Sequence, residues 1–244
     1  MSGANQKATD ASAKTGISFR GSSERPELPK QNNYEIAEAM ARQALAHLDA
    51  AKQAGRCGAE LAMAGSDRVE LRFAWFGQPV GASFPDGAVR NLRDGAEVPI
   101  WERIILLHYV GNIAPVWESS DLIGFNEVPS GSFYLGAFVR RSHRPLAEFF
   151  GRKPKALLDA GGLIGAVPAG LGDAAVAVKV VPKVTVTAVV HAADEEFPAD
   201  AKLLFPASIG SYFCTEDIAV IGGFVAGRLI RAGRQVEGIA RQEK

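Results

Sequence analysis

The residues best suited to bind an anion lie in the middle of the chain, where residues 140–155 hold six basic side chains and one acid. The basic residues are Arg140, Arg141, Arg144, Arg152, Lys153 and Lys155. Aromatic residues lie just before or among them: Phe133, Tyr134, Phe138, Phe149 and Phe150. Arginine forks beside aromatic faces suit a flat anionic ligand, because a carboxylate or phosphate accepts two hydrogen bonds while the rings stack. The alternative is a solvated basic helix surface whose rings pack in the core.

A second charged cluster is acidic and lies nearer the C-terminus, with only Lys202 as a basic member. Its acids are Asp194, Glu195, Glu196, Asp200, Glu216 and Asp217. The first four could hold a divalent cation or act as a general base, with His191 nearby as a helper. A solvated or salt-bridged turn is the alternative for these four, and helix capping explains the last two. The acidic and basic clusters could also neutralise each other, within the fold or across a dimer, without any ligand.

Two histidines and both cysteines are further candidates. His108 lies in an otherwise apolar helix pattern, which favours a hydrogen-bonded core or cleft histidine over a metal ligand. His143 is the better exposed candidate. Cys57 lies in a turn beside glycine, and Cys214 precedes a helix whose dipole could lower the thiol pKa. Since neither cysteine has a partner nearby in the sequence, structural packing is the favoured interpretation for both.

Several familiar motifs are excluded by their surroundings. Residues 170–175 have the spacing of a dinucleotide-binding loop, but they precede a strand pattern, whereas that loop must lead into a helix. Residues 165–170 have P-loop spacing, but Leu171 occupies the position of the essential lysine. The common zinc-protease, Cys-x-x-Cys and serine-elbow motifs are missing from the sequence. With two cysteines, any metal must be held mostly by oxygen or imidazole.

The composition is that of an ordinary globular protein. The chain has 244 residues, 47% of them hydrophobic, with 27 basic and 27 acidic side chains. A net charge of zero argues against a general nucleic-acid binder, which needs a surplus of lysine and arginine. The longest uncharged apolar stretch falls short of the roughly 20 residues that cross a bilayer, and the first residues lack the apolar run of a secretory signal. We therefore predict a cytoplasmic protein with reduced thiols and without a membrane span.

Hydrophobic periodicity predicts the elements that must position these residues. Helical spacing predicts helices over residues 34–55, from 99 to about 110, over 145–150, over 154–163 and from Thr215 to Gly233. Alternation predicts a hairpin over residues 69–84 and a short strand at 202–205. Valines alternate on both sides of Pro182, which predicts one bent edge strand or two strands joined at a kink, because proline cannot donate to a central ladder.

Three segments follow from this pattern. Residues 1–33 contain few large apolar side chains, so they are predicted to form a disordered N-terminal arm. Residues 34–233 are predicted to form a single α+β domain, with a largely antiparallel sheet packed against several helices. Residues 234–244 are polar and are predicted to be a frayed tail.

Six strings in the sequence, taken together, resemble a widespread prokaryotic family known as domain of unknown function 3786. They are NYEIA (33–37), VPIWERIILLHY (98–109), FFG (149–151), LGDAA (171–175), DEEFP (194–198) and TEDI (215–218). The resemblance spans about Asn33 to Ala226. It implies a cytoplasmic domain, frequent in anaerobes, with some relatives fused to a small iron–sulfur domain like that of corrinoid proteins in one-carbon metabolism.

This chain departs from the resemblance in three respects. It contains no cysteine-rich iron–sulfur segment, which puts a redox role of its own in doubt. His191 stands where the family pattern has Trp, and Pro206 stands where it has Asp. The second difference removes one carboxylate from any metal site in this region.

The leading hypothesis is a cytoplasmic accessory or binding protein rather than an enzyme. It would engage an anionic cofactor, such as a tetrapyrrole or corrinoid, or a partner protein of a redox or corrinoid one-carbon system. The residues assigned to this role are His108, Tyr134, Arg140, Arg141 and His143.

Two alternatives remain open. In the first, a metal-dependent enzyme uses Asp194, Glu195, Glu196 and Asp200 to hold a divalent cation. In the second, the domain is a subunit of a larger assembly, with residues 1–33 ordered on a neighbour. The ligand hypothesis requires the basic and aromatic side chains to meet at one concavity.

Overall fold

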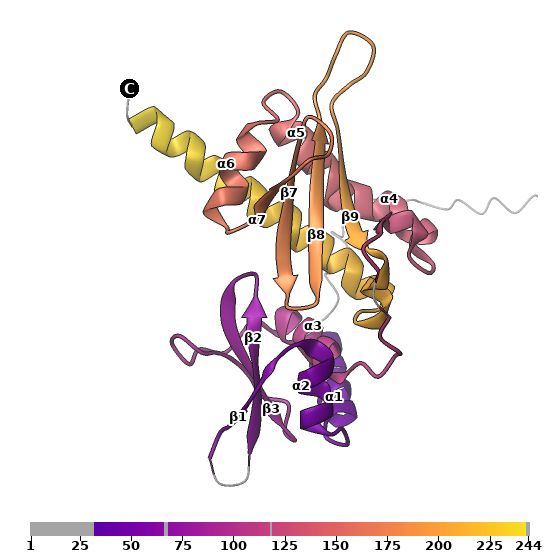
Figure 1. Ribbon diagram of the computed structural model, residues 1–244, viewed down its shortest axis with the longest axis vertical. Helices are drawn as coiled ribbons and strands as arrows, with labels where there is room; N and C mark the ends of the chain where they lie inside the picture. The colour runs from indigo at the N-terminus through magenta and orange to yellow at the C-terminus, as the bar shows by residue number, and fades with distance from the viewer. Residues whose placement is uncertain (1–31, 66–67, 118, 243–244) are drawn as a thin grey trace, which may run out of the picture.

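Two antiparallel sheets and the helices around them make an α+β fold, which confirms the predicted class. The computed structural model describes residues 32–65, 68–117 and 119–242. The predicted N-terminal arm lies almost wholly outside these ranges. Figure 1 shows the two sheets following one another along the long axis of the molecule. The first has the order β1-β2-β3-β4, with bounds Glu60–Met63, Val69–Trp75, Gln78–Phe84 and Val89–Asn91.

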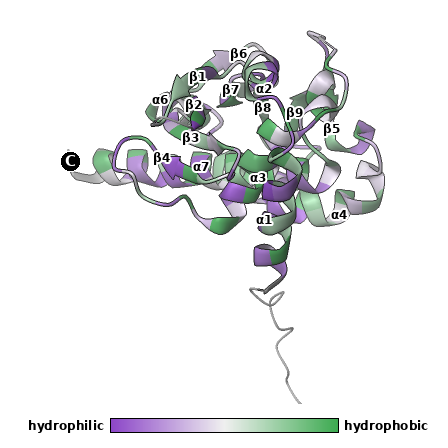
Figure 2. Ribbon diagram, turned by 90° about the horizontal axis from the view of Figure 1, so that it is seen from below, coloured by the Kyte–Doolittle hydropathy of each residue, from purple (hydrophilic) through white to green (hydrophobic). Residues whose placement is uncertain are grey.

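Three helices accompany the first sheet: α1 (Asn32–Leu45), α2 (Ala50–Cys57) and α3 (Ile100–Gly111). The sequence predicts one helix where α1 and α2 stand. The chain instead starts a new helix after Asp49, whose carboxylate accepts hydrogen bonds from the backbone N–H groups of Ala51 and Lys52. Helix α3 lies beside α1 (Figure 2) and begins directly after Pro99, as predicted. The predicted hairpin over 69–84 is confirmed as β2 and β3.

The second sheet has the order β5-β9-β8-β7-β6. Its strands are β5 (Leu122–Gly124), β6 (Val167–Ala169), β7 (Ala174–Val181), β8 (Val184–His191) and β9 (Asp200–Pro206). The edge-strand interpretation of the valine-rich segment is wrong, because β7 and β8 form a hairpin in the interior of this sheet. Pro182 lies in the two-residue turn between them, where no ladder hydrogen bond is needed from it.

The helices of the second half are α4 (Gly131–Arg141), α5 (His143–Phe150), α6 (Ala156–Leu163) and α7 (Thr215–Gln242), with short 3-10 turns at Phe125–Glu127 and Ala207–Ser211. Helix α7 runs across one face of the second sheet (Figure 1). It begins at Thr215 as predicted but continues to Gln242, through the segment for which the sequence predicts a frayed tail. Within the residues that the structure describes, no helix combines the length and the apolar character that crossing a bilayer requires.

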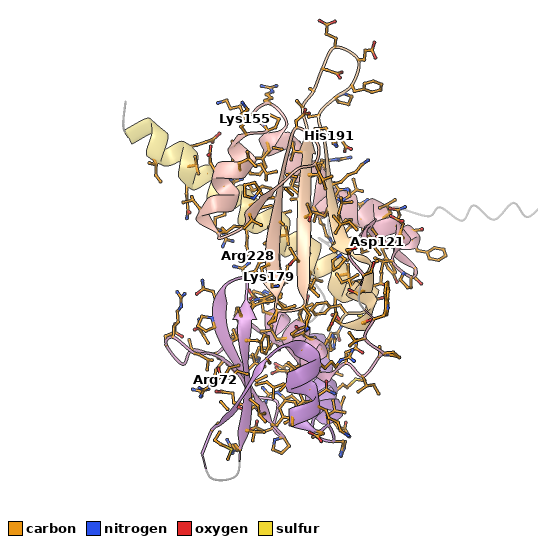
Figure 3. The ribbon with its side chains drawn as sticks, in the orientation of Figure 1. Arg72, Asp121, Lys155, Lys179, His191 and Arg228 are labelled. Carbon is orange, nitrogen blue, oxygen red and sulfur yellow. The ribbon has the colours of Figure 1, made fainter. Side chains whose placement is uncertain are left out.

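Arg228 of α7 joins the two halves of the molecule, and Figure 3 shows it between the sheets. Its guanidinium lies 4.3 Å from the ring centroid of Phe76 and 3.6 Å from the carboxylate of Glu102 in α3. The indole N–H of Trp75 donates to the same carboxylate. The backbone N–H of Phe76 also donates to the carbonyl of Val180, at 2.9 Å, so a turn of the first sheet is hydrogen-bonded to a strand of the second.

Tyr109 of α3 makes a second connection and yields a stability prediction. Its buried hydroxyl donates to the Cys57 carbonyl (2.6 Å) and accepts from the Lys183 N–H (3.2 Å). Tyr109→Phe should lower the free energy of unfolding by about 1–2 kcal/mol, because both backbone groups lose their partner. Urea denaturation measures this. Tyr134→Phe, at a half-exposed ring, should change stability by less than about 0.5 kcal/mol. Equal effects of the two variants would contradict the prediction.

Candidate functional site

The five residues predicted to bind a ligand lie in separate places. His108 lines a cleft of about 230 Å³ between α1, α3 and the start of α7. Tyr134 lines a hollow of about 360 Å³ beside the start of α7. His143 lines the largest of the three, about 770 Å³. Arg140 and Arg141 are exposed in the last turn of α4, outside the walls of these three hollows.

We call the largest one the α5 hollow. Its wall is formed by Val139, His143, Arg144, Ala147, Glu148 and Arg152 on one side and Ala193, Pro198, Ala199 and Asp200 on the other. Members of the basic and acidic clusters therefore border one concavity. Figure 3 shows Lys155 of the basic cluster and His191, the last residue of β8, at the same end of the molecule.

The sequence of α5 explains how this wall forms. Helical spacing places His143 and Ala147 one turn apart, with Arg144 and Glu148 beside them, while Phe150 is buried in the core. Gly151 then ends the helix where the chain packs against the opposite wall. A methyl group at this position would lie 2.2 Å from the Ala199 side chain and 2.4 Å from the Ala147 carbonyl oxygen. Only glycine allows this close approach, so Gly151 sets the separation of the two walls.

His143 is a neutral hydrogen-bonding group rather than a cation. Its Nε2 accepts a hydrogen bond from the backbone N–H of Leu203 in β9, at 3.0 Å. Burial lowers the pKa of the imidazole to about 4. Near neutral pH the single ring proton therefore sits on Nδ1, which leaves one N–H donor on a residue that lines the hollow.

The charged residues of the wall are largely uncommitted. Among the described residues, the side chains of Arg144, Arg152 and Glu148 have no hydrogen-bond or ion-pair partner. The Asp200 carboxylate lies 4.0 Å from the Lys202 amine, and its charge also acts on His143. The acidic and basic clusters thus border the same space without neutralising each other through ion pairs in the described part of the chain. The guanidinium groups of Arg144 and Arg152 keep their hydrogen-bond donors available.

The loop between β8 and β9 holds the carboxylates predicted to bind a metal. Asp194 accepts hydrogen bonds from the backbone N–H groups of Glu196 (2.9 Å) and Phe197 (2.6 Å), so it closes a turn. Glu195 and Glu196 are exposed. Asp194, Glu195, Glu196 and Asp200 are not among the clusters, within the described ranges, whose ligand atoms lie within 4.8 Å of one another. The metal site in this loop stays a prediction without geometric support.

The cluster of metal-binding residue types that the described structure does contain lies around His108. Its Nδ1 is 2.9 Å from both carboxylate oxygens of Asp217, and the Cys214 thiol donates to the same carboxylate at 3.2 Å. Potential ligand atoms of these three residues lie within 4.8 Å of one another. Asp217 is buried, and it also accepts the Cys214 backbone N–H at 3.3 Å, which caps α7.

The surroundings raise the pKa values of two of these groups, His108 and Cys214. The hydrogen bond to Asp217 raises the pKa of His108 above its usual value. Partial desolvation of the thiol, followed by the charge of Asp217, raises the pKa of Cys214 to about 12, although the residue as a whole is exposed. The expectation that the helix dipole lowers this thiol pKa is therefore corrected, because desolvation and the adjacent Asp217 carboxylate both raise it.

Sequence reasoning missed the partnership of His108 with Asp217, which lie 109 positions apart. Asp217 does cap α7, as the sequence indicates, and because capping already explains an acid at this position, its contact with His108 was not predicted. The usable signal was the polar His108 in an apolar helix, since a half-buried imidazole needs a partner. Arg144 and Arg152 belong to the predicted basic cluster, but the predicted ligand-binding residues do not include them.

Most of the chain matches the model of one protein family. A family model described as a domain of unknown function, DUF3786, matches residues 49–228. The chain belongs to the DUF3786 family. This confirms the resemblance based on the six sequence strings. No curated protein and no solved structure matches the chain. Both the α5 hollow and the His108 cluster lie within the part of the DUF3786 domain that the family model covers.

Proposed function

We propose that this DUF3786 protein binds a small anionic molecule in the α5 hollow. The observation that supports this most directly is the pair Arg144 and Arg152, which lack a protein partner in the described structure and border a space of about 770 Å³. Small-molecule sites commonly enclose about 300–1,000 Å³ and carry a few converging polar groups. Unpaired guanidinium groups beside such a space are suited to a carboxylate or phosphate.

The other wall residues define the ligand further. The neutral His143 supplies an N–H donor without adding charge. Glu148 and Asp200 are acceptors, and they disfavour a ligand with negative charge over its whole surface. The best fit is a molecule with a carboxylate or phosphate near the arginines and hydroxyl or amino groups near the acids.

The proposed role is that of a cytoplasmic accessory or binding protein. The hollow offers groups that bind and orient a ligand, and the family resemblance implies a redox or corrinoid one-carbon setting. An anionic cofactor of such a system is therefore the ligand class we favour. Arg140 and Arg141 follow Val139, which lines the hollow, so their exposed charges would attract an anion toward it.

Titration calorimetry with AMP, glucose 6-phosphate and citrate tests this proposal. We expect the protein to bind at least one of these probes. The double variant Arg144→Ala/Arg152→Ala should weaken that binding at least about tenfold, because charge-assisted hydrogen bonds to the anionic group are lost.

The matched control removes the same charge elsewhere. Arg93 and Lys52 are exposed on the first half of the molecule, away from the α5 hollow. Arg93→Ala/Lys52→Ala should therefore bind the probe as the unmodified protein does. If both double variants weaken probe binding equally, the loss reflects the net charge of the protein and not the two arginines of the hollow. If none of the three probes binds, the result counts against the hollow as an anion site.

A further inference from the structure

The cluster around His108 combines three kinds of ligand atom from two helices. His108, in α3, offers an imidazole nitrogen, whereas Cys214 and Asp217, at the start of α7, offer a sulfur and a carboxylate oxygen. Structural capping alone requires Asp217 and a backbone N–H. It does not require an imidazole and a thiol to meet at the same carboxylate.

The cluster also borders open space. The cleft of about 230 Å³ beside it is lined by His108, Cys214 and Asp217 together with small or apolar residues of α1 and α3, namely Ala41, Ala44, Leu107 and Gly111, and by Asn112. Helices α1 and α3 lie side by side at this end of the molecule (Figure 2). A metal ion at the cluster could therefore keep a position open to a water molecule or a small ligand in the cleft.

We propose that His108, Cys214 and Asp217 form a binding site for a zinc-class divalent ion, with its remaining coordination position facing the cleft. A nitrogen, a thiolate sulfur and one carboxylate oxygen suit Zn²⁺ or Co²⁺, whereas Mg²⁺ and Ca²⁺ prefer oxygen ligands. Three protein ligands with one open position are the arrangement of catalytic rather than structural zinc sites. This site shares no lining residue with the α5 hollow, so it is independent of the proposed anion binding.

The hydrogen bonds within the cluster determine which contacts must change when an ion binds. The thiol proton now points to Asp217, so Cys214 must release it to solvent to become a thiolate ligand. A protonated His108 must likewise release a proton before its nitrogen can bind the ion. Asp217 then exchanges its hydrogen bonds to His108 and Cys214 for a bond to the metal.

A thiol nucleophile is the competing use of the same residues, and the geometry disfavours it. An activated cysteine transfers its proton to an adjacent histidine or loses it near positive charge. Cys214 instead donates to a carboxylate, and its pKa of about 12 keeps it protonated near neutral pH. Metal binding supplies the positive charge that this thiol otherwise lacks.

Cobalt titration of the full-length chain, freed of metal with a chelator and kept under reducing conditions, tests the site. We expect a thiolate-to-cobalt charge-transfer band in the near ultraviolet, with visible bands typical of four-coordinate cobalt, and loss of both on adding Zn²⁺. Cys214→Ser should remove the charge-transfer band. His108→Gln should weaken cobalt binding at least about tenfold, since one of three protein ligands is lost.

Cys57→Ser is the matched control, because it alters the other cysteine while its hydroxyl can still donate to the Tyr109 carbonyl. It should keep the charge-transfer band. Cys214 is exposed, so its serine variant should fold, and circular dichroism verifies this for each variant. A missing band in the unmodified protein, or one that survives in folded Cys214→Ser, would overturn the proposal.

Discussion

Gly222→Ala should lower the free energy of unfolding by about 2–3 kcal/mol, whereas Gly223→Ala should leave it unchanged or raise it by up to about 1 kcal/mol. A methyl group at Gly222 would lie 2.4 Å from the ring of Phe138 and 3.3 Å from Leu203, within a packed core. At Gly223 the same methyl group meets nothing within 4 Å, and alanine favours the helix.

Urea denaturation of the two variants measures this difference in sign. Phe138 cannot easily move aside, because it stacks on Phe125 with 4.0 Å between ring centroids and packs at a steep angle against the His143 ring with 5.0 Å between centroids. A displaced Phe138 would thus disturb the α5 hollow as well. If both variants have the same stability, Gly222 of α7 and Phe138 of α4 are packed less tightly than these distances indicate.

Acidification from pH 6.5 to pH 4 should cost the folded protein up to about 3 kcal/mol through His143. The folded pKa of about 4 lies below the usual value of 6.5, so the unfolded chain binds this proton more readily. The contribution of the neutral ring is complete above pH 6.5 and is lost as the pH falls toward 4. Protonation of Nε2 also breaks the hydrogen bond from Leu203.

Comparison with the His143→Gln variant separates the pH dependence caused by His143 from that of the other titratable groups. Burial lowers the pKa of His143 most; the charge of nearby Asp200 raises it by less, and Lys202 lowers it further. Free energies of unfolding measured between pH 4 and pH 7 should fall more steeply for the unmodified protein than for the variant. Parallel pH profiles would contradict a buried neutral His143.

The sequence predicted elements well where one face of an element meets the core. The alternation over residues 69–84 indicated the first hairpin, and the Thr215 start of α7 was correct. The β7–β8 hairpin was misjudged because its turn, Pro182 and Lys183, lacks the usual glycine or asparagine, while Tyr109 accepts the Lys183 N–H from a distant helix. Helix α4 was missed because much of it is exposed, so its hydrophobic pattern is weak.

The candidate sites depended on contacts that local patterns do not encode. The basic cluster recognised in the sequence includes α5, and its side chains Arg144 and Arg152 have no ion-pair partner among the described residues. Which members of the cluster border a hollow depends on how α5 meets residues 193–200, and Gly151 governs that approach. The meeting of His108 and Asp217 depends on the packing of α3 against the start of α7, which only the tertiary structure supplies.

Helix α7 also limits how the protein can be divided. It holds Asp217 in its first turn, directly after Cys214, packs on Phe138 through Gly222, and is ion-paired to α3 through Arg228. A shortened chain that stops before this helix would lose Asp217, the support behind the hollow and the link between the sheets together. Neither half of the polypeptide, expressed alone, should retain the His108 cleft, because its walls come from both.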